Sequence, residues 1–183
     1  MMDAVLATAG IPKKSITHCA FANGPGAFTG IRIAASQAQG VGLALDIPLL
    51  PVSTLAVLAQ TSLDKFSTNK ILVALDARMA EIYWAVYCRD YQGLATLAGV
   101  EALTAVDDVD INDDIECAVG HGWAVSGMPD LAGKSCSVDI ELLPDARSLL
   151  KLAREVAKQD RGVAADRISI NYLRNQVAEK AKN

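Results

Sequence analysis

The spacing of apolar residues along the first 65 positions predicts alternating helices and strands. Apolar positions that recur three and four residues apart predict helices, and short apolar runs bounded by glycine or proline predict strands. The elements expected in this half are a helix at 3–9, a strand at 16–22, a helix at 30–45, a strand at 47–52 and a helix at 54–61 capped by Ser53.

The second half shows a different order of patterns, with strands before helices. We expect strands at 71–76, 81–88, 94–100, 115–119 and 137–143, a short helical piece capped by Thr104, and a helix at 146–159 capped by Asp145. In the strand at 81–88, Ile82, Trp84, Val86 and Cys88 face one side, and Tyr83, Ala85 and Tyr87 face the other.

The polar stretch at 62–70 separates two halves that resemble each other in their order of elements. When the halves are aligned, the first lacks three opening strands that the second has. We therefore expect an incomplete first subdomain at 1–66, a second subdomain at 67–165, and a tail or helix at 166–183.

The expected helix at 30–45 is unusually apolar, because Arg32 is the only charged residue between Thr29 and Leu45. A helix with so little charge is buried in its own fold or covered by a partner. Its predicted apolar stripe consists of Ile31, Ala34, Ala35, Ala38, Val41 and Leu45. The glycines Gly30, Gly40 and Gly42 would let another backbone come close. A glutamate at Ala38 is expected to disrupt pairing of two copies through this stripe.

Composition narrows the classes of function. The 183 residues carry a net charge of −4, and acidic and basic residues are interspersed without a basic stripe. This balance argues against a protein that binds nucleic acid on its own, since phosphate contacts need clustered lysine and arginine. The 4 cysteines are unpaired in spacing, which favours buried thiols in a reducing cytoplasm. No apolar run approaches the roughly 18 residues that a membrane span needs.

The loop at 24–30, Gly-Pro-Gly-Ala-Phe-Thr-Gly, joins an expected strand to a helix N-terminus. Free N–H groups and the positive helix end suit an anion, and this alternative assigns Gly24, Gly26, Thr29, Gly30 and Arg32 to a phosphate or nucleotide loop. No lysine follows as in a P-loop. The other alternative is structural: the glycines form a tight turn and Thr29 caps the helix.

No residue set predicts catalysis or a metal site. The two histidines, His18 and His121, lie about a hundred residues apart and do not form a helical pair of ligands. Asp76 and Glu81 flank a turn, where acidic residues usually serve turn formation and solvation. The aspartates at 107–114 lack the spacing of a calcium loop.

Three segments in this order resemble markers of the TsaB (YeaZ) family. They are residues 24–59, which begin GPGAFTG, residues 74–87, ALDARMAEIYWAVY, and the ending Asn171-Tyr172-Leu173-Arg174-Asn175. The resemblance implies an α/β fold of the ASKHA (actin/Hsp70-like) type, with two related subdomains, of which the first lacks its opening strands here.

The resemblance also implies a function. The family acts with TsaD, TsaE and TsaC proteins to make threonylcarbamoyladenosine in tRNA, and TsaD is its catalytic subunit. This chain would be a cytoplasmic, non-catalytic scaffold that binds a TsaD-like subunit and a TsaE-like ATPase, forms a homodimer in isolation and meets tRNA only through the complex. The alternative is a nucleotide-binding or glycoprotease-like peptidase enzyme that uses the loop at 24–30.

By the same resemblance, the partner interface is made by the helices on either side of that loop. The matching residues are Val5, Leu6, Ile31, Ala34, Ala35, Ala38, Val41, Gly42 and Leu45. No resident cofactor or metal is expected, and ATP or ADP would bind only at an interface shared with the catalytic partner.

Overall fold

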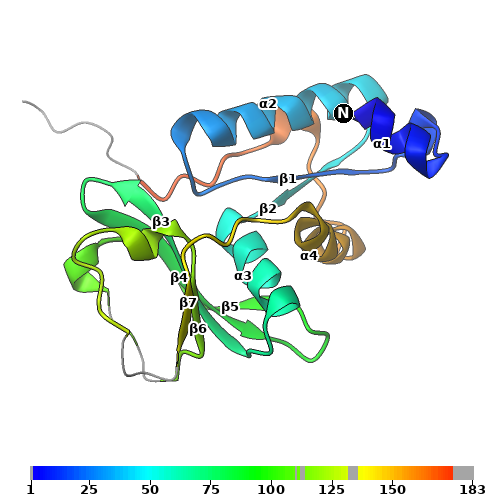
Figure 1. The fold of residues 1–183 in the computed structure, drawn as a ribbon. Coiled ribbons are helices and arrows are strands. Elements are labelled where there is room, and N and C mark those ends of the chain that lie inside the picture. Colours follow the sequence, from blue (N-terminus) through cyan, green and yellow to red (C-terminus); the bar gives the residue numbers. More distant parts are fainter. Residues whose placement is uncertain (1, 110, 112–113, 132–135, 175–183) are drawn as a thin grey trace, which may run out of the picture.

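A computed structural model describes residues 2–109, 111, 114–131 and 136–174, and it contains two β-sheets with helices packed against them (Figure 1). The smaller sheet pairs β1 (Cys19–Ala22) with β2 (Leu49–Val52) in parallel. Helix α2 (Phe28–Leu45) makes the connection between them, as parallel neighbours require a crossover. The predicted α/β class is confirmed.

Helices cover both faces of this small sheet, with α2 on one face and α4 (Ala146–Lys158) on the other (Figure 1). Successive strand residues point to opposite faces, so neighbours in β2 serve different cores. Leu49 packs with Phe21 under α2, whereas Leu50 packs with Leu152 of α4.

The larger sheet has the strand order β5-β4-β3-β6-β7. Its strands are β3 (Lys70–Arg78), β4 (Glu81–Arg89), β5 (Ala95–Ala105), β6 (Cys117–Val119) and β7 (Ser137–Asp139). The hairpin of β3 and β4 and the pairing of β4 with β5 are antiparallel, while β6 and β7 add in parallel. The predicted alternation in β4 is confirmed, because Ala85 and Tyr87 face the core under α3 (Thr54–Lys65) and Ile82 faces the opposite core.

Short 3-10 helices complete the order of elements, and they correct one expectation. They are η1 (Lys13–Ser15), η2 (Val106–Asp108), η3 (His121–Ala124) and η4 (Ala165–Arg167). The prediction that Thr104 caps a helical piece is wrong. Thr104 lies inside β5, where its Oγ1 accepts a hydrogen bond of 2.9 Å from the indole of Trp84, and η2 begins after Ala105.

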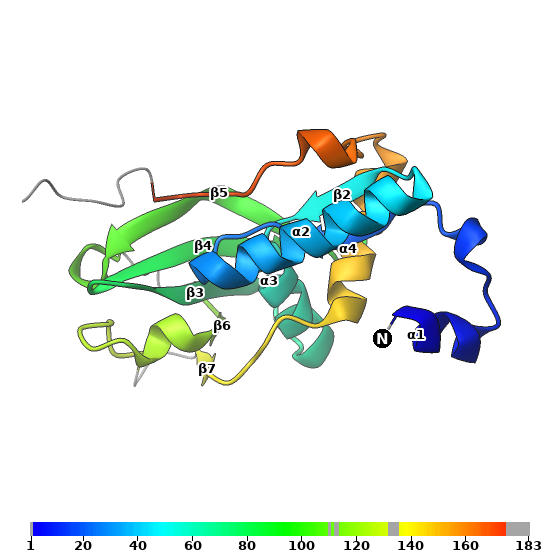
Figure 2. The same cartoon turned by 90° about the horizontal axis from the view of Figure 1, so that it is seen from above.

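Helix α1 (Met2–Ala9) has no buried residue, and Figure 2 shows it standing apart from the two sheets. Helix α3 runs four residues further than expected and contributes to the cores of both sheets, through Leu58 to the larger and Val57 to the smaller. The division at residues 66 and 67 stays a prediction. In the described part of the chain, no helix is long and apolar enough to cross a membrane.

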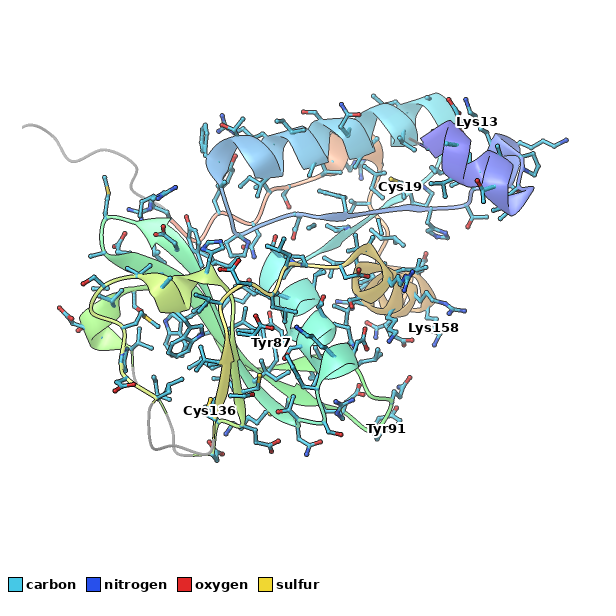
Figure 3. The ribbon with its side chains drawn as sticks, viewed as in Figure 1. Lys13, Cys19, Tyr87, Tyr91, Cys136 and Lys158 are labelled. Atoms are coloured by element: carbon cyan, nitrogen blue, oxygen red, sulfur yellow. The ribbon has the colours of Figure 1, made fainter. Side chains whose placement is uncertain are left out.

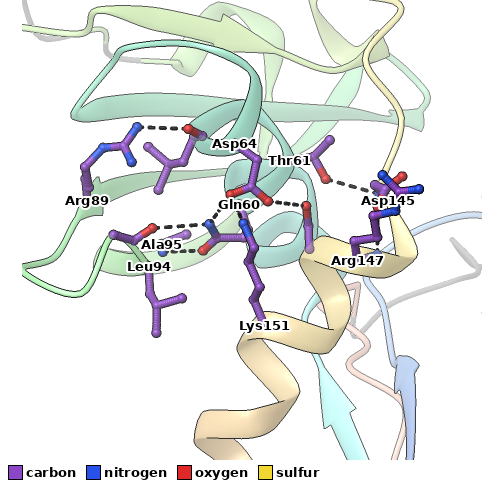
Figure 4. Close-up of polar contacts among 12 residues, drawn as sticks. Gln60, Thr61, Asp64, Arg89, Leu94, Ala95, Asp145, Arg147 and Lys151 are labelled. Atoms are coloured by element: carbon purple, nitrogen blue, oxygen red, sulfur yellow. Dashed lines mark hydrogen bonds and ion pairs between the residues drawn. The ribbon is translucent and has the colours of Figure 1, made fainter.

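A buried amide joins α3 to the turn between β4 and β5 (Figure 4). Gln60 is 0% exposed, and its Oε1 accepts a hydrogen bond of 2.9 Å from the backbone N–H of Ala95. Its Nε2 donates to the carbonyl of Gly93 at 3.2 Å and to the carboxylate of Asp64 at 3.0 Å. A buried amide is stable only when its polar atoms are paired, so this residue fixes how α3 meets the turn.

Asp64 extends this junction to α4, where it accepts hydrogen bonds from Ser148 at 2.8 Å and from Lys151 at 2.6 Å (Figure 4). Burial opposes ionisation of this carboxyl, but the hydrogen bonds from Lys151, Ser148 and Gln60 outweigh burial and hold its pKa below the usual range.

Replacing Asp64 with asparagine is expected to lower the free energy of unfolding at pH 7 by about 1–2 kcal/mol, because hydrogen bonds to a charged group are lost. A carboxyl with a lowered pKa in the folded state stabilises the fold above its unfolded pKa of about 3.9. That contribution disappears as pH falls through the lower folded-state pKa. Urea denaturation of both proteins at pH 7 and pH 3 checks this, and a stability difference of equal size at both pH values would contradict it.

Candidate functional site

The inner face of α2 consists of residues that the sequence assigned to a partner interface. Ile31, Ala35 and Ala38 are 8%, 4% and 4% exposed, and Ala35 and Ala38 pack on Phe21, Leu49 and Ala165. The side chains on this face therefore serve the chain's own core and are not available to a partner. A glutamate at Ala38 would damage the fold itself, so it is unsuitable as a test of association.

Gly42 also belongs to the inner face. A β-carbon placed there would lie 2.9 Å from Cδ2 of Leu49 and 3.1 Å from Cβ of Ala165, so the close packing of α2 on β2 needs a glycine. The remaining residues of the predicted stripe, Ala34, Val41 and Leu45, are partly buried at the border of this face.

The outer face of α2 is different in kind, because large apolar side chains are exposed on it. Phe28, Ile33 and Leu43 are 54%, 57% and 69% exposed. Near the N-terminal end of the helix the surface is hollowed, with a volume of about 380 Å³. The hollow is lined by Phe28, Thr29, Arg32, Ile33, Ser36 and Gln37.

The α1 residues that the sequence assigned to the same interface are accessible. Val5 is 63% exposed and Leu6 is partly buried. An ion pair of 2.7 Å between Asp3 and Lys13 joins the helix to η1. Residues of both helices are thus exposed, but on α2 the accessible set is not the predicted one.

The glycine-rich loop before α2 is held by the backbone of other segments. Gly24 has a φ of +106°, and a β-carbon there would lie 2.8 Å from the carbonyl oxygen of Asn171. Its own carbonyl accepts a hydrogen bond of 2.8 Å from the N–H of Thr54. Close packing and the left-handed backbone therefore explain why a glycine stands here.

The prediction that Thr29 caps α2 is wrong. The helix begins at Phe28, the N-cap position is Ala27, and no side chain caps it. Thr29 and Gly30 lie exposed in the first turn, and Gly26 is partly buried. Arg32 turns to the aromatic residues: its guanidinium lies 3.5 Å from the ring centre of Phe28, and its Nε donates to the hydroxyl of Tyr172 at 2.9 Å.

The three sequence markers meet in space along the segment at 171–174. The backbone N–H of Asn171 donates to the carbonyl of Asn23, next to the glycine-rich loop, at 2.8 Å. At the other end of the segment, Arg174 pairs with Glu81 and donates to the carbonyl of Ala77 at 3.0 Å, so it binds the hairpin of β3 and β4. We call residues 171–174 the strap, because they tie the smaller sheet to the larger one.

Glu101 lies at the centre of this junction, and sequence reasoning missed it. Its carboxylate accepts hydrogen bonds from Ser53, from Tyr87 at 2.7 Å and from Asn171 of the strap at 2.7 Å. Burial raises the pKa of Tyr87, and the charge of Glu101 raises it further. The sequence did contain one indication of its position: Gly99 lies inside a strand, and a glycine inside a strand often marks a bulge.

That bulge is present in β5. Ala98 pairs with Val86 and Ala102 pairs with Trp84, so three residues of β5 stand opposite one residue of β4. Gly99 has a φ of +100°. A bulge redirects side chains, and here it goes with an inward Glu101 and an outward Val100, which is 77% exposed.

The residues considered for catalysis or metal binding are separate from one another. His18 is exposed and contacts the hydroxyl of Thr17 at 3.0 Å, whereas Nδ1 of His121 accepts a hydrogen bond of 3.1 Å from the N–H of Asp76. The carboxylate of Asp76 accepts from the N–H of Arg78 at 2.7 Å, which is a turn contact. Among the described residues, no three His, Cys, Asp or Glu side chains form a metal-binding group. Asp110 and Asp113 of the acidic cluster lie outside the described residues.

Comparison with known proteins agrees with the markers. Residues 1–122 match the family described as "TsaD: tRNA N6-adenosine threonylcarbamoyltransferase". The tRNA threonylcarbamoyladenosine biosynthesis protein TsaB of Escherichia coli is 36% identical over 189 aligned positions, which cover 98% of this chain and 80% of the relative. The protein of the same name from Haemophilus influenzae is 30% identical, with 98% and 79% covered.

Solved structures that resemble this chain are also YeaZ proteins or proteins described as similar to YeaZ. YeaZ from Pseudomonas aeruginosa is 38% identical and superimposes with a TM-score of 0.86, covering 94% of this chain and 82% of that one. A second Pseudomonas aeruginosa structure, described as similar to peptidase YEAZ, has a TM-score of 0.87 at 37% identity, with 95% and 81% covered. The chain belongs to the TsaB (YeaZ) family, whose curated members act in tRNA threonylcarbamoyladenosine biosynthesis, and it has that family's ASKHA-like fold.

Proposed function

We propose that this chain is a non-catalytic scaffold subunit of the tRNA-modifying machinery and that it docks a TsaD-like catalytic subunit on the outer face of α2. The observation that carries the proposal is the apolar character of that face. Ile33 and Leu43 are more than half exposed, and the helix carries a single charged residue, Arg32. Exposed apolar surface of this kind is typical of a protein interaction site.

The shape of the face favours another helix as the occupant. Ser36, Gly40 and Ala44 follow one another at four-residue spacing, so they form a row of small side chains along the helix. A β-carbon at Gly40 would meet nothing within 4 Å, so this chain does not need a glycine there for its own packing. Small residues in a row allow a second helix to approach closely, with ridges fitting into grooves.

The rest of the chain supports a role without catalysis. The residues with suitable chemistry are engaged in the fold: Asp76 holds its turn and Glu101 holds the strap. Helix α1 adds further apolar surface through Val5. In the absence of the catalytic partner, a second copy of this chain would use the outer face of α2, and a TsaE-like ATPase would join the assembled pair.

Association with a TsaD-like subunit tests the proposal. Wild-type chain is expected to bind it at micromolar concentration in sedimentation or pull-down, and Leu43→Glu is expected to weaken binding at least tenfold, because a charge would be placed in an apolar contact. Tyr91→Glu is a matched control, since Tyr91 is 94% exposed at the turn after β4, away from α2 (Figure 3). No association of the wild-type chain, or an equal loss for both variants, would contradict the proposal.

A further inference from the structure

Helix α4 arranges basic residues on one side. Arg147, Lys151, Arg154 and Lys158 are separated by four, three and four residues. At 3.6 residues per turn these positions fall within an arc of about 60°, and they extend over roughly 16 Å of helix. Arg161 follows three residues later. We call these five residues the basic stripe.

The stripe faces solvent, because the other side of α4 holds the helix on the smaller sheet. Leu152 and Ala153 are buried there, at 9% and 1% exposure. All five basic residues are exposed, and the side chains of Lys151 and Lys158 are 51% and 65% accessible. Figure 3 shows Lys158 pointing away from the body of the molecule.

The lysines of the basic stripe form ion pairs, whereas its arginines form none within the described part of the chain. Lys151 is paired with Asp64 and Lys158 with Glu155, so both lysines are partly neutralised. Among the described residues, no carboxylate pairs with Arg147, Arg154 or Arg161. Arg147 and Arg154 lie seven residues apart on α4, which is about 10 Å along the helix axis, and Arg161 follows beyond the end of the helix. They are available to an external anion, and guanidinium groups suit phosphate oxygens particularly well.

The stripe lies on the opposite side of the smaller sheet from the proposed docking face. Helix α2 covers one face of β1 and β2, and α4 covers the other (Figure 1). A protein partner on α2 would therefore leave α4 accessible. The chain as a whole has a net charge of −4, so a local basic stripe would orient a polyanion towards this one side.

We infer that the basic stripe of α4 binds the phosphate backbone of the tRNA. RNA is the polyanion that this family's pathway presents, since the curated relatives are tRNA threonylcarbamoyladenosine biosynthesis proteins. Folded RNA is recognised largely through shape and phosphate contacts, for which a row of arginines suffices without base-specific groups. The inference rests on the proposed function, in which one subunit holds the catalytic protein and the RNA on different faces.

The basic stripe is not evident from the order of charges along the sequence. Counted along the sequence, acidic and basic residues alternate, and no basic stripe is visible. Asp145, Glu155 and Asp160 interrupt the run around α4. Within α4 the one acidic residue is Glu155, which is partly buried and pairs with Lys158; Asp145 is the N-cap residue and Asp160 lies beyond the end of the helix.

Binding of a fluorescein-labelled, unmodified tRNA transcript to the purified chain tests the inference. Fluorescence anisotropy at 50 mM salt is expected to show saturable binding. The double variant Arg147→Glu/Arg154→Glu should lower the affinity at least tenfold. It should also reduce the slope of log K against log salt by about 2, since two phosphate contacts are lost. Arg147→Lys/Arg154→Lys keeps both charges and should keep the slope.

Lys65→Glu/Arg78→Glu makes the same change of net charge elsewhere on the surface and should retain most of the affinity. Circular dichroism checks that each variant is folded. Binding of the TsaD-like subunit should be unchanged in Arg147→Glu/Arg154→Glu, so the outcome for the RNA is separate from the outcome for docking on α2. Absence of saturable tRNA binding, equal losses in both charge-reversed variants, or preferential binding to vesicles of anionic lipid would overturn the inference.

Discussion

Gly40→Arg is expected to abolish the association with the TsaD-like subunit while leaving the fold intact. Nothing lies within 4 Å of the position that a side chain would first occupy, so the chain accommodates the substitution. Arginine also favours a helix over glycine, and the free energy of unfolding should rise by about 0.8 kcal/mol. In the complex, a long charged side chain would keep the two helices apart. We expect a loss of affinity of at least 100-fold, or about 2.7 kcal/mol.

Gly42→Ala, on the same helix, is expected to affect stability and not the docking face. The added methyl group would lie 2.9 Å from the side chain of Leu49, so this variant should lose stability although its outer face is unchanged. Sedimentation with the partner and thermal melting of each variant separate the two effects. If Gly40→Arg binds the partner like the wild type, the row of small residues is not the contact.

Glu101→Ala is expected to destabilise the fold strongly, although Glu101 lies outside the two helices of the proposed docking site. The substitution removes the acceptor of three hydrogen bonds and leaves the hydroxyl of Tyr87, a residue only 2% exposed, without its partner. Buried donors without acceptors cost about 1–3 kcal/mol each. A total loss of about 3–4 kcal/mol should lower Tm by roughly 10 °C in a protein of this size.

Val100→Ala is the matched control, because Val100 is the neighbouring residue of the same bulge and is 77% exposed. Its Tm should stay within about 1–2 °C of the wild type, as expected for a surface change of under 0.5 kcal/mol. Differential scanning calorimetry measures both variants. A Tm for Glu101→Ala equal to that of Val100→Ala would show that the junction does not hold the two sheets together.

The sequence predicted most elements of the fold, because periodicity and caps act locally. Ser53 accepts hydrogen bonds from Leu55 and Ala56, and Asp145 accepts one from Arg147, so both predicted caps are confirmed. The hairpin of β3 and β4 is also confirmed. The ends of elements were less accurate: β5 continues to Ala105, because pairing with β4 extends it beyond its apolar run.

Which face of α2 is exposed could not be read from its residues. Both sides of this helix are apolar, so periodicity found the stripe through Ala35 and Ala38 but did not distinguish core from surface. The face with Ala35 and Ala38 is the buried one because Leu49 and Ala165 pack against it, and these contacts come from distant parts of the chain. Glu101 was missed for a related reason, since its partners lie 14 to 70 residues away in the chain.

The strap has a consequence for how the protein acquires its structure during synthesis. Tyr172 contacts Arg32 across 140 residues, and Asn171 reaches Glu101 across 70. A ribosome makes the strap after both sheets, so the contacts of the strap form last and close long loops of the chain. Until then the nascent protein would depend on α3, which packs into the cores of both sheets, to hold them together. A pause in translation before residue 171 would lengthen that interval. The three family markers become neighbours only at the end of this sequence of events.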